Sequence, residues 1–269
     1  MTLDFCYDMQ VSFSVPVTEH HYALMCLPKD TARQRIRTLY LTVEPEGEQD
    51  IDKDYFENRI IRGQINEPHN VFRVTIQGSA DTGLALHEAY EENPSAIYRV
   101  FSKCTNPGSS LRAFYKSLRE AMPAELKDAE QAENTTYERA HYWMKALVSR
   151  MVYQPGITNV HTTAEEAFAL GQGVCQDFAH IYLSLLRLDG INARYVVGMM
   201  AGEGESHAWT EVNCKGYWYG FDPTNQLLVN DQYIKISHGR DYADCIVTRG
   251  IFRGAADQAQ RITVTVKGV

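Results

Sequence analysis

The N-terminal part of the chain alternates apolar and polar residues, a pattern typical of a half-buried strand. Every odd position from 3 to 17 is apolar, and most of the even positions between them are polar. Residues 37–43 and 71–77 predict further strands, because apolar and β-branched residues recur there between turn-forming prolines and glycines. The sequence therefore predicts a β-rich domain over residues 1–105.

Further along the chain the apolar residues change to helical spacing. This spacing predicts helices over 111–122 and 135–151, each with its apolar residues on one face. The sequence Thr163-Ala-Glu-Glu166 is a capping-box pattern, so a short helix is expected to follow it. Another helix is expected to begin near Cys175, because a broad apolar face runs from there to a glycine stop at Gly190.

Strand patterns return after these helices. Residues 193–199, 207–213 and 217–221 read as strands, with Lys215-Gly216 as the turn between the last two. Helices followed by strands are typical of an α+β fold. We therefore expect an α+β catalytic domain over residues 106–269, behind the β-rich one.

Composition narrows the functional classes. The net charge is −8 and the pI is near 5.6, which disfavours a nucleic-acid partner. We expect no membrane span, since no apolar stretch is long enough, and no secretory signal, since the N-terminus carries acids and no basic region. The six cysteines lie far apart and form no CxxC pair, which fits free thiols in a cytoplasmic protein.

Three separate segments supply the residue types that a cysteine nucleophile needs. Cys175 follows a glycine-rich turn and opens the apolar helix, where unpaired N–H groups and the helix dipole stabilise a thiolate. His207 opens one predicted strand, and Asp222 ends the neighbouring one. Together they offer a thiolate, a base that forms it and an acid that orients the base.

Other interpretations of these residues remain open at this point. A lone cysteine before an apolar helix is more often an inert buried thiol than a nucleophile. Asp177 and His180 stand close to Cys175 and raise the alternative of a metal site. Helical side chains at 175, 177 and 180 do not share one face well, however, and no second Cys/His cluster completes a tetrahedral set. We therefore expect neither a metal nor another cofactor.

Several motifs resemble the transglutaminase-like superfamily of papain-related thiol enzymes, and specifically its bacterial branch. The resemblance is carried by Gly173-Val-Cys-Gln-Asp-Phe-Ala-His180, His207-Ala-Trp209 and Phe221-Asp-Pro-Thr-Asn225, and it continues in Tyr153–Val160 and Gly239–Asp244. It implies an α+β papain-like catalytic domain behind an N-terminal β domain, a peptide or protein amide as substrate, and a triad in which Cys175 is the nucleophile, His207 the base and Asp222 the orienting acid.

Residues around this triad are assigned supporting roles. Backbone N–H groups at the helix start are expected to stabilise the oxyanion, with Tyr153 or Gln172 as the side-chain donor that completes the hole. Asp177 and Trp209 are expected to form walls of the cleft.

The final acceptor of the acyl group is left open by the sequence. Water would make the protein a cysteine peptidase or amidase, whereas a lysine amine would make it a protein-glutamine transglutaminase. Resemblance to the bacterial branch favours hydrolysis. A third interpretation, from another class, is a non-catalytic peptide-binding or scaffold module on the same fold.

Overall fold

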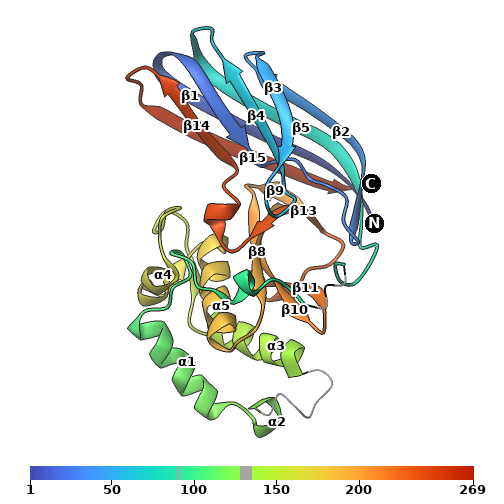
Figure 1. Cartoon of the computed structure of the whole chain (residues 1–269), viewed down its shortest axis with the longest axis vertical. Helices are drawn as coiled ribbons and strands as arrows, with labels where there is room; N and C mark the ends of the chain where they lie inside the picture. Colours follow the sequence, from blue (N-terminus) through green and yellow to red (C-terminus); the bar gives the residue numbers. More distant parts are fainter. Residues whose placement is uncertain (90, 92, 128–134) are drawn as a thin grey trace.

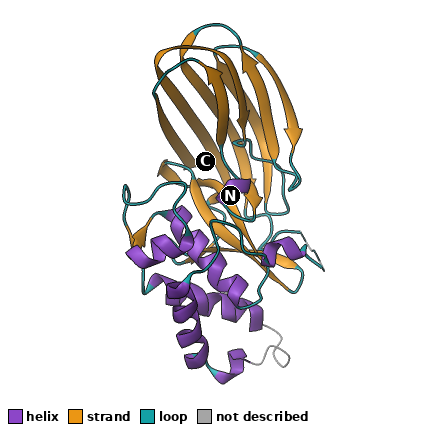
Figure 2. Cartoon of the chain, turned by 60° about the vertical axis from the view of Figure 1, so that its left-hand side comes forward, coloured by secondary structure: helices purple, strands orange, loops and turns teal. Residues whose placement is uncertain are grey.

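The computed structural model describes residues 1–89, 91, 93–127 and 135–269. The fold is α+β, as predicted: strands fill one end of the molecule, and helices pack beside a second sheet at the other end (Figures 1 and 2). None of the described helices has the length and apolar character that crossing a bilayer requires.

The larger sheet has eight strands and is organised around its first one. Its members are β1 (Thr2–Leu24), β2 (Gln34–Glu44), β3 (Glu48–Lys53), β4 (Arg59–Ile65), β5 (His69–Thr82), β9 (Gly202–Gly204), β14 (Thr248–Arg253) and β15 (Gln258–Gly268). The first half of β1 pairs with β5 and β15, and its second half pairs with β4 and β14.

The alternation in the sequence identified β1 correctly but did not show where it bends. Odd-numbered apolar residues from Leu3 to Phe13 are buried, whereas Val15 is 45% exposed. The pairing of β1 with β5 shifts register between Ser12 and Val17. Burial changes from odd to even positions further along, between Val17 and His20, next to the register shift between Thr18 and His21 in the pairing with β14.

Strands from the end of the chain complete this sheet. Eleven residue pairs join β15 to β1, from Leu3↔Gly268 to Phe13↔Gln258. In Figure 1 the two C-terminal strands lie beside the N-terminal one. The boundary predicted between residues 105 and 106 stays a prediction, but residues 248–268 belong to the same sheet as the N-terminal strands.

The second sheet has five antiparallel strands and carries most of the predicted site. Its order is β12 (Leu227–Leu228), β11 (Tyr217–Asp222), β10 (His207–Cys214), β8 (Ala193–Met200) and β13 (Tyr233–Gly239). The predicted turn at Lys215-Gly216 is confirmed: both residues have positive φ, at 52° and 88°, which suits a tight hairpin.

The helices pack around α5 (Cys175–Leu188), whose residues from Gln176 to Arg187 are all buried. The others are α1 (Ser109–Ala121), α2 (Ala124–Lys127), α3 (Thr135–Val148) and α4 (Ala164–Leu170). The expected capping box is present at the start of α4, and this helix ends at Gly171 in the left-handed conformation. A helix that is buried on all sides holds its first residue in a fixed position.

Candidate active site

Cys175 is the first residue of α5, and the Asp177 side chain stabilises the start of this helix through hydrogen bonds. The Oδ2 atom of Asp177 accepts hydrogen bonds from the Val174 N–H at 2.7 Å and the Thr158 hydroxyl at 2.6 Å. A Cβ atom on Gly173 would lie 2.5 Å from that same oxygen. Glycine is therefore required before the helix so that the carboxylate can reach the backbone.

His207 and Asp222 lie on neighbouring strands of the smaller sheet. Thr210 on β10 pairs with Phe221 on β11, so His207, Trp209 and Asp222 share the opposite face of the sheet. His207 Nε2 donates to Asp222 Oδ2 across 2.7 Å. The predicted contact between imidazole and carboxylate is therefore present in the structure.

Asp222 is fully buried, and donors surround its carboxylate. Oδ1 accepts from the backbone N–H groups of Thr224 at 2.9 Å and Asn225 at 3.2 Å. Oδ2 accepts from the Asn225 side chain and from the Tyr233 hydroxyl, each at 2.8 Å, in addition to His207. This network fixes which way the carboxylate faces and therefore how it orients the imidazole.

The charges of the pair support each other. Burial acts against the imidazolium form of His207, but the hydrogen bonds and charges of Asp222 and Cys175 outweigh it and raise the pKa of His207 to about 10. Burial also acts against the Asp222 carboxylate, but its hydrogen bond with His207, the charge of His207 and the donors Asn225 and Tyr233 lower its pKa. At neutral pH the ring is an imidazolium and the carboxylate is ionised.

Cys175 interacts with the imidazole of His207 as well. Its side chain is one of the hydrogen-bond partners and one of the charges that raise the pKa of His207. Asp222 occupies Nε2, so Nδ1 is the nitrogen available to the sulfur. Cys175 and His207 are both partly exposed, so neither residue is closed off from solvent.

The two predicted oxyanion donors lie on two short paired strands, the second of which ends shortly before Cys175. Val152 and Tyr153 form β6, which pairs in parallel with β7 (Gln172–Gly173), so Tyr153 lies opposite Gly173. Burial raises the pKa of Tyr153, and the nearby charges of Cys175 and Glu205 raise it further. Tyr153 is therefore close to Cys175, with 52% of its surface exposed. Which of Tyr153 and Gln172 completes an oxyanion hole stays a prediction.

Asp177 and Trp209, expected as cleft walls, are both buried, with 1% of each residue exposed, and their role in the cleft stays a prediction. Asp177 supports the start of α5. The Trp209 ring lies 6.3 Å from that of His207 and is close to parallel with it, at 28°. Packing of this kind restricts the rotation of the imidazole.

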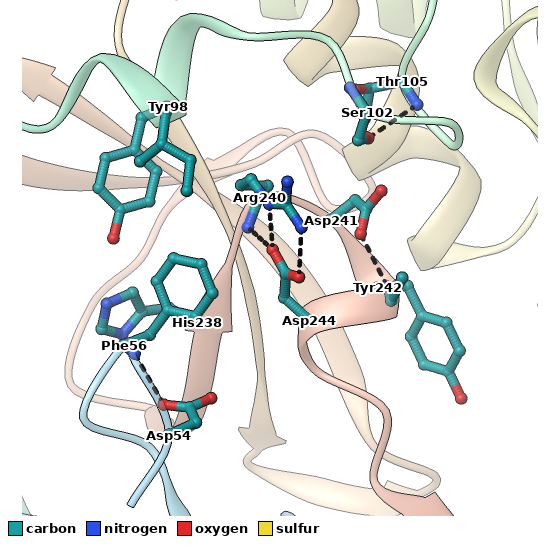
Figure 3. A network of polar contacts seen from close by, with 12 residues as sticks. Asp54, Phe56, Tyr98, Ser102, Thr105, His238, Arg240, Asp241, Tyr242 and Asp244 are labelled. Carbon is teal, nitrogen blue, oxygen red and sulfur yellow. Dashed lines mark hydrogen bonds and ion pairs between the residues drawn. The ribbon is translucent and has the colours of Figure 1, made fainter.

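The tail motif Gly239–Asp244 holds α5 from its far side. The Tyr242 N–H donates to His180 Nε2 at 3.1 Å, and Arg187 donates to the Arg240 carbonyl at 2.6 Å. Figure 3 shows the Arg240–Asp244 ion pair and Asp241, which keep this segment folded. His180 is thus a structural residue, and burial lowers its pKa to about 4. Among the described residues no group of three or more His, Cys, Asp or Glu side chains is placed to hold a metal ion.

Comparisons with known proteins agree with this geometry. Residues 123–223 match the model of the transglutaminase-like superfamily, and residues 3–81 match the bacterial transglutaminase-like N-terminal region. The chain belongs to the transglutaminase-like superfamily. Both expected parts of the resemblance, the core and the N-terminal region, are therefore present.

Bacterial relatives extend over most of the chain. An uncharacterized protein of Mycobacterium tuberculosis is 29% identical over 265 residues, covering 89% of this chain and 83% of that protein. An uncharacterized protein of Mycobacterium leprae is 40% identical over 129 residues, but this match covers only 44% of the chain and 46% of that protein. These relatives support a bacterial family without adding a known activity.

One solved structure shares the whole architecture. A protein of Cytophaga hutchinsonii, described as a "putative cysteine protease", superposes with a TM-score of 0.73 and covers 100% of this chain and 91% of its own. The two sequences are 22% identical, so the comparison shows a common fold.

Proposed function

We propose that this member of the superfamily is a thiol hydrolase that cleaves amide bonds in peptides or proteins through an acyl-thioester on Cys175. The observation that carries the proposal is the 2.7 Å hydrogen bond from His207 to the buried Asp222, with Cys175 acting on the same ring. A buried carboxylate that accepts this many donors is suited to orient an imidazole rather than to take its proton.

The proposed reaction uses Cys175 and His207 in turn. The Cys175 thiolate attacks the carbonyl carbon of the amide and forms the carbon–sulfur bond. His207 gives its proton to the leaving nitrogen as the carbon–nitrogen bond breaks, which releases the amine and leaves the acyl-thioester. His207, now neutral, takes a proton from water. The resulting hydroxide attacks the thioester, which releases the carboxylic acid and restores the thiolate and imidazolium.

Stabilisation of the oxyanion falls to the start of α5. The first N–H groups of a helix have no partner in its own ladder, and that of Cys175 is at the first position. An oxyanion formed on the attacked carbonyl would accept from this N–H and from a side chain on β6 or β7. Tyr153 and Gln172 remain the two candidates for that side chain.

Hydrolysis and transamidation differ only in what attacks the thioester. The family resemblance favours water, and a protein-glutamine transglutaminase remains the alternative within the same chemistry. A cytoplasmic location also stays a prediction; it rests on the cysteines, all six of which are free thiols.

Trapping of the thioester tests the proposal directly. The protein is mixed with peptide amide, isopeptide and glutamine-donor substrates, quenched in acid and analysed by mass spectrometry, with Cys175→Ala as the control. We expect an acyl adduct on Cys175 that decays in water to a free acid, and preferential labelling of Cys175 by iodoacetamide over the other five thiols.

The other outcomes separate the alternatives. Decay only when an amine is added, with the amine incorporated into the product, would identify a transglutaminase. Equal labelling of Cys175 and Cys6, with no adduct from any substrate class, would identify a non-catalytic module and refute the proposal.

A further inference from the structure

A cavity of about 700 Å³ lies between the large sheet and the segment that follows the catalytic strands, away from the triad. Its walls come from parts of the chain that are distant in sequence: β1, β5, the residues at 103–104 and 160–161, and β14 and β15. Ligand pockets commonly have volumes of about 300–1,000 Å³. Nothing in the proposed mechanism uses this space.

The floor of the cavity is aromatic and has one polar atom without a partner. Phe13, Phe72 and Phe252 line it, and each of their rings packs against the ring of His20, with centroids 4.8–6.1 Å apart. His20 is itself only 4% exposed. Its Nδ1 lies 3.1 Å from His69 Nε2, and its Nε2 has no hydrogen-bond partner among the described residues.

The state of that nitrogen follows from its neighbours. His69 Nδ1 lies 2.9 Å from the Glu67 carbonyl, which can only accept, so His69 donates there. With the proton of His69 on Nδ1, its Nε2 is the atom placed to accept, and His20 Nδ1 donates to it. Burial lowers the pKa of His20 to about 4, so its ring is neutral at pH 7. His20 Nε2 is then a bare lone pair that can accept a hydrogen bond from a ligand.

The rest of the lining favours an anion. Lys103 and Arg249 contribute cations, and none of the described residues that line the cavity is Asp or Glu. This bias occurs in a chain whose net charge is −8. The cavity thus has an apolar floor, an acceptor within that floor and cations in its wall. A ligand that fits it has an apolar ring, a hydrogen-bond donor and a negative charge.

We propose that this cavity binds a small aromatic acid that carries a ring hydroxyl or N–H group. The ring lies among Phe13, Phe72 and Phe252, its hydroxyl or N–H donates to His20 Nε2, and its carboxylate faces Arg249 and Lys103. This site is separate from Cys175, so it stands or falls independently of the proposed hydrolase activity.

Binding of matched ligands tests each contact. The probe is 4-hydroxyphenylacetate, compared by isothermal titration calorimetry with phenylacetate, which lacks the donor, and with 4-hydroxyphenylethanol, which lacks the charge. A net hydrogen bond of about 0.5–1.5 kcal/mol corresponds to roughly 2- to 12-fold in affinity. We expect phenylacetate to bind more weakly than the probe by such a factor, and the alcohol to bind more weakly as well.

Two variants locate the site. A Cβ atom on Gly250 would lie 3.0 Å from His20 Nε2, so the methyl group of Gly250→Ala would cover this acceptor. The variant should therefore lose more affinity for the probe than for phenylacetate. Gly204→Ala, where the added methyl group has no neighbour within 4 Å, is its control. Arg249→Gln should lower the affinity for the two acids by about 2- to 5-fold and leave the affinity for the alcohol unchanged. Replacement of the exposed Arg35 by Gln should not change the affinity for any of the three compounds.

The protonation of His20 gives an independent readout. In protein labelled with ¹⁵N-histidine, we expect the His20 Nε2 resonance to move from its lone-pair position when the probe binds. No saturable binding of the probe up to about 10 mM, which is weaker than any specific site of this kind, would overturn the proposal. Unchanged affinity in Gly250→Ala, or an unshifted His20 resonance at saturation, would overturn it equally.

Discussion

Tyr233 donates a 2.8 Å hydrogen bond to the same oxygen of Asp222 that accepts from the imidazole. It comes from β13, at the far edge of the sheet from β11, and its ring also packs edge-on against Trp209 at 5.5 Å. In the proposed mechanism Tyr233 is therefore a positioning residue: it acts on Cys175 and His207 through the Asp222 carboxylate.

Replacement of Tyr233 by Phe should reduce the rate without changing substrate binding. The change removes one donor to the carboxylate, a loss of about 0.5–1.5 kcal/mol, so we expect kcat to fall roughly 2- to 12-fold with KM unchanged. Tyr7→Phe is the matched control, because the Tyr7 hydroxyl is buried without a hydrogen-bond partner among the described residues. An equal loss in both variants would show a general packing effect.

The three triad residues should differ in severity. Cys175→Ala removes the covalent route, so activity should fall to background, and His207→Ala should come close behind it. Asp222→Asn should cost less than either, on the order of 10- to 10⁴-fold in single-turnover rate. An Asp222→Asn enzyme as active as the wild type would assign the orienting role to another group.

The hydrogen bonds of Asp222 also affect the stability of the Asp222→Asn variant. Asp222 accepts hydrogen bonds on both oxygens, so an amide NH₂ would face donors on one side. Asp222→Asn should therefore also lower the free energy of unfolding, and rates should be compared at a temperature where both proteins are folded.

The sequence indicated the positions of Cys175, His207 and Asp222 more clearly than the contacts around them. Each lies in a short motif at one end of a predicted element, and the structure contains the expected hydrogen bond between His207 and Asp222, whereas their catalytic roles stay predictions. Tyr233 lies on a strand that reaches the site only through the strand order β12-β11-β10-β8-β13, which no local pattern encodes. The hydrogen bond from Asn225 to Asp222 could have been predicted from the sequence, because an Asp-Pro-Thr-Asn turn places the asparagine amide next to the aspartate.

The fold was predicted in a similar way. Strong periodicity identified β1 and the helices, whereas β3 was missed because all of its residues are exposed and mostly polar. The alternation of Ile262, Val264 and Val266 in β15 was a usable signal. Its partner, however, lies at the opposite end of the chain, and pairing across that distance cannot be read from periodicity.

The raised pKa of His207 predicts a specific dependence of stability on pH. Folding raises this pKa from 6.5 to about 10, so the folded chain holds the proton more tightly than the unfolded chain. This stabilisation is fully present below pH 6.5, declines as the pH rises and is lost above about 10. Urea unfolding at several pH values should show the stability difference between the wild type and His207→Gln shrinking across that window. A constant difference would contradict the assignment.

Asp177 should matter for the stability of the nucleophile helix. Asp177→Ala removes the acceptor of the Val174 N–H and should cost about 1–2 kcal/mol of unfolding free energy. Asp177→Asn keeps a side-chain oxygen there and should restore most of it, since burial already raises the pKa of Asp177 and makes its charge costly. Urea denaturation of the three proteins checks the order, and equal losses in both variants would contradict it.

Residues 248–269 should fail to fold without the N-terminal strands. A fragment of residues 106–269 retains β14 and β15 but lacks β1, with which they form their ladders. Their unpaired edges and the apolar residues Val264 and Val266, both buried in the whole chain, would then be exposed. We expect this fragment to aggregate in light scattering, and a fragment of residues 106–247 to aggregate less. β9 immediately precedes His207 and pairs with β15, so the shorter fragment should also lose activity even where it stays folded. If it kept full activity, the large sheet would have no part in positioning His207.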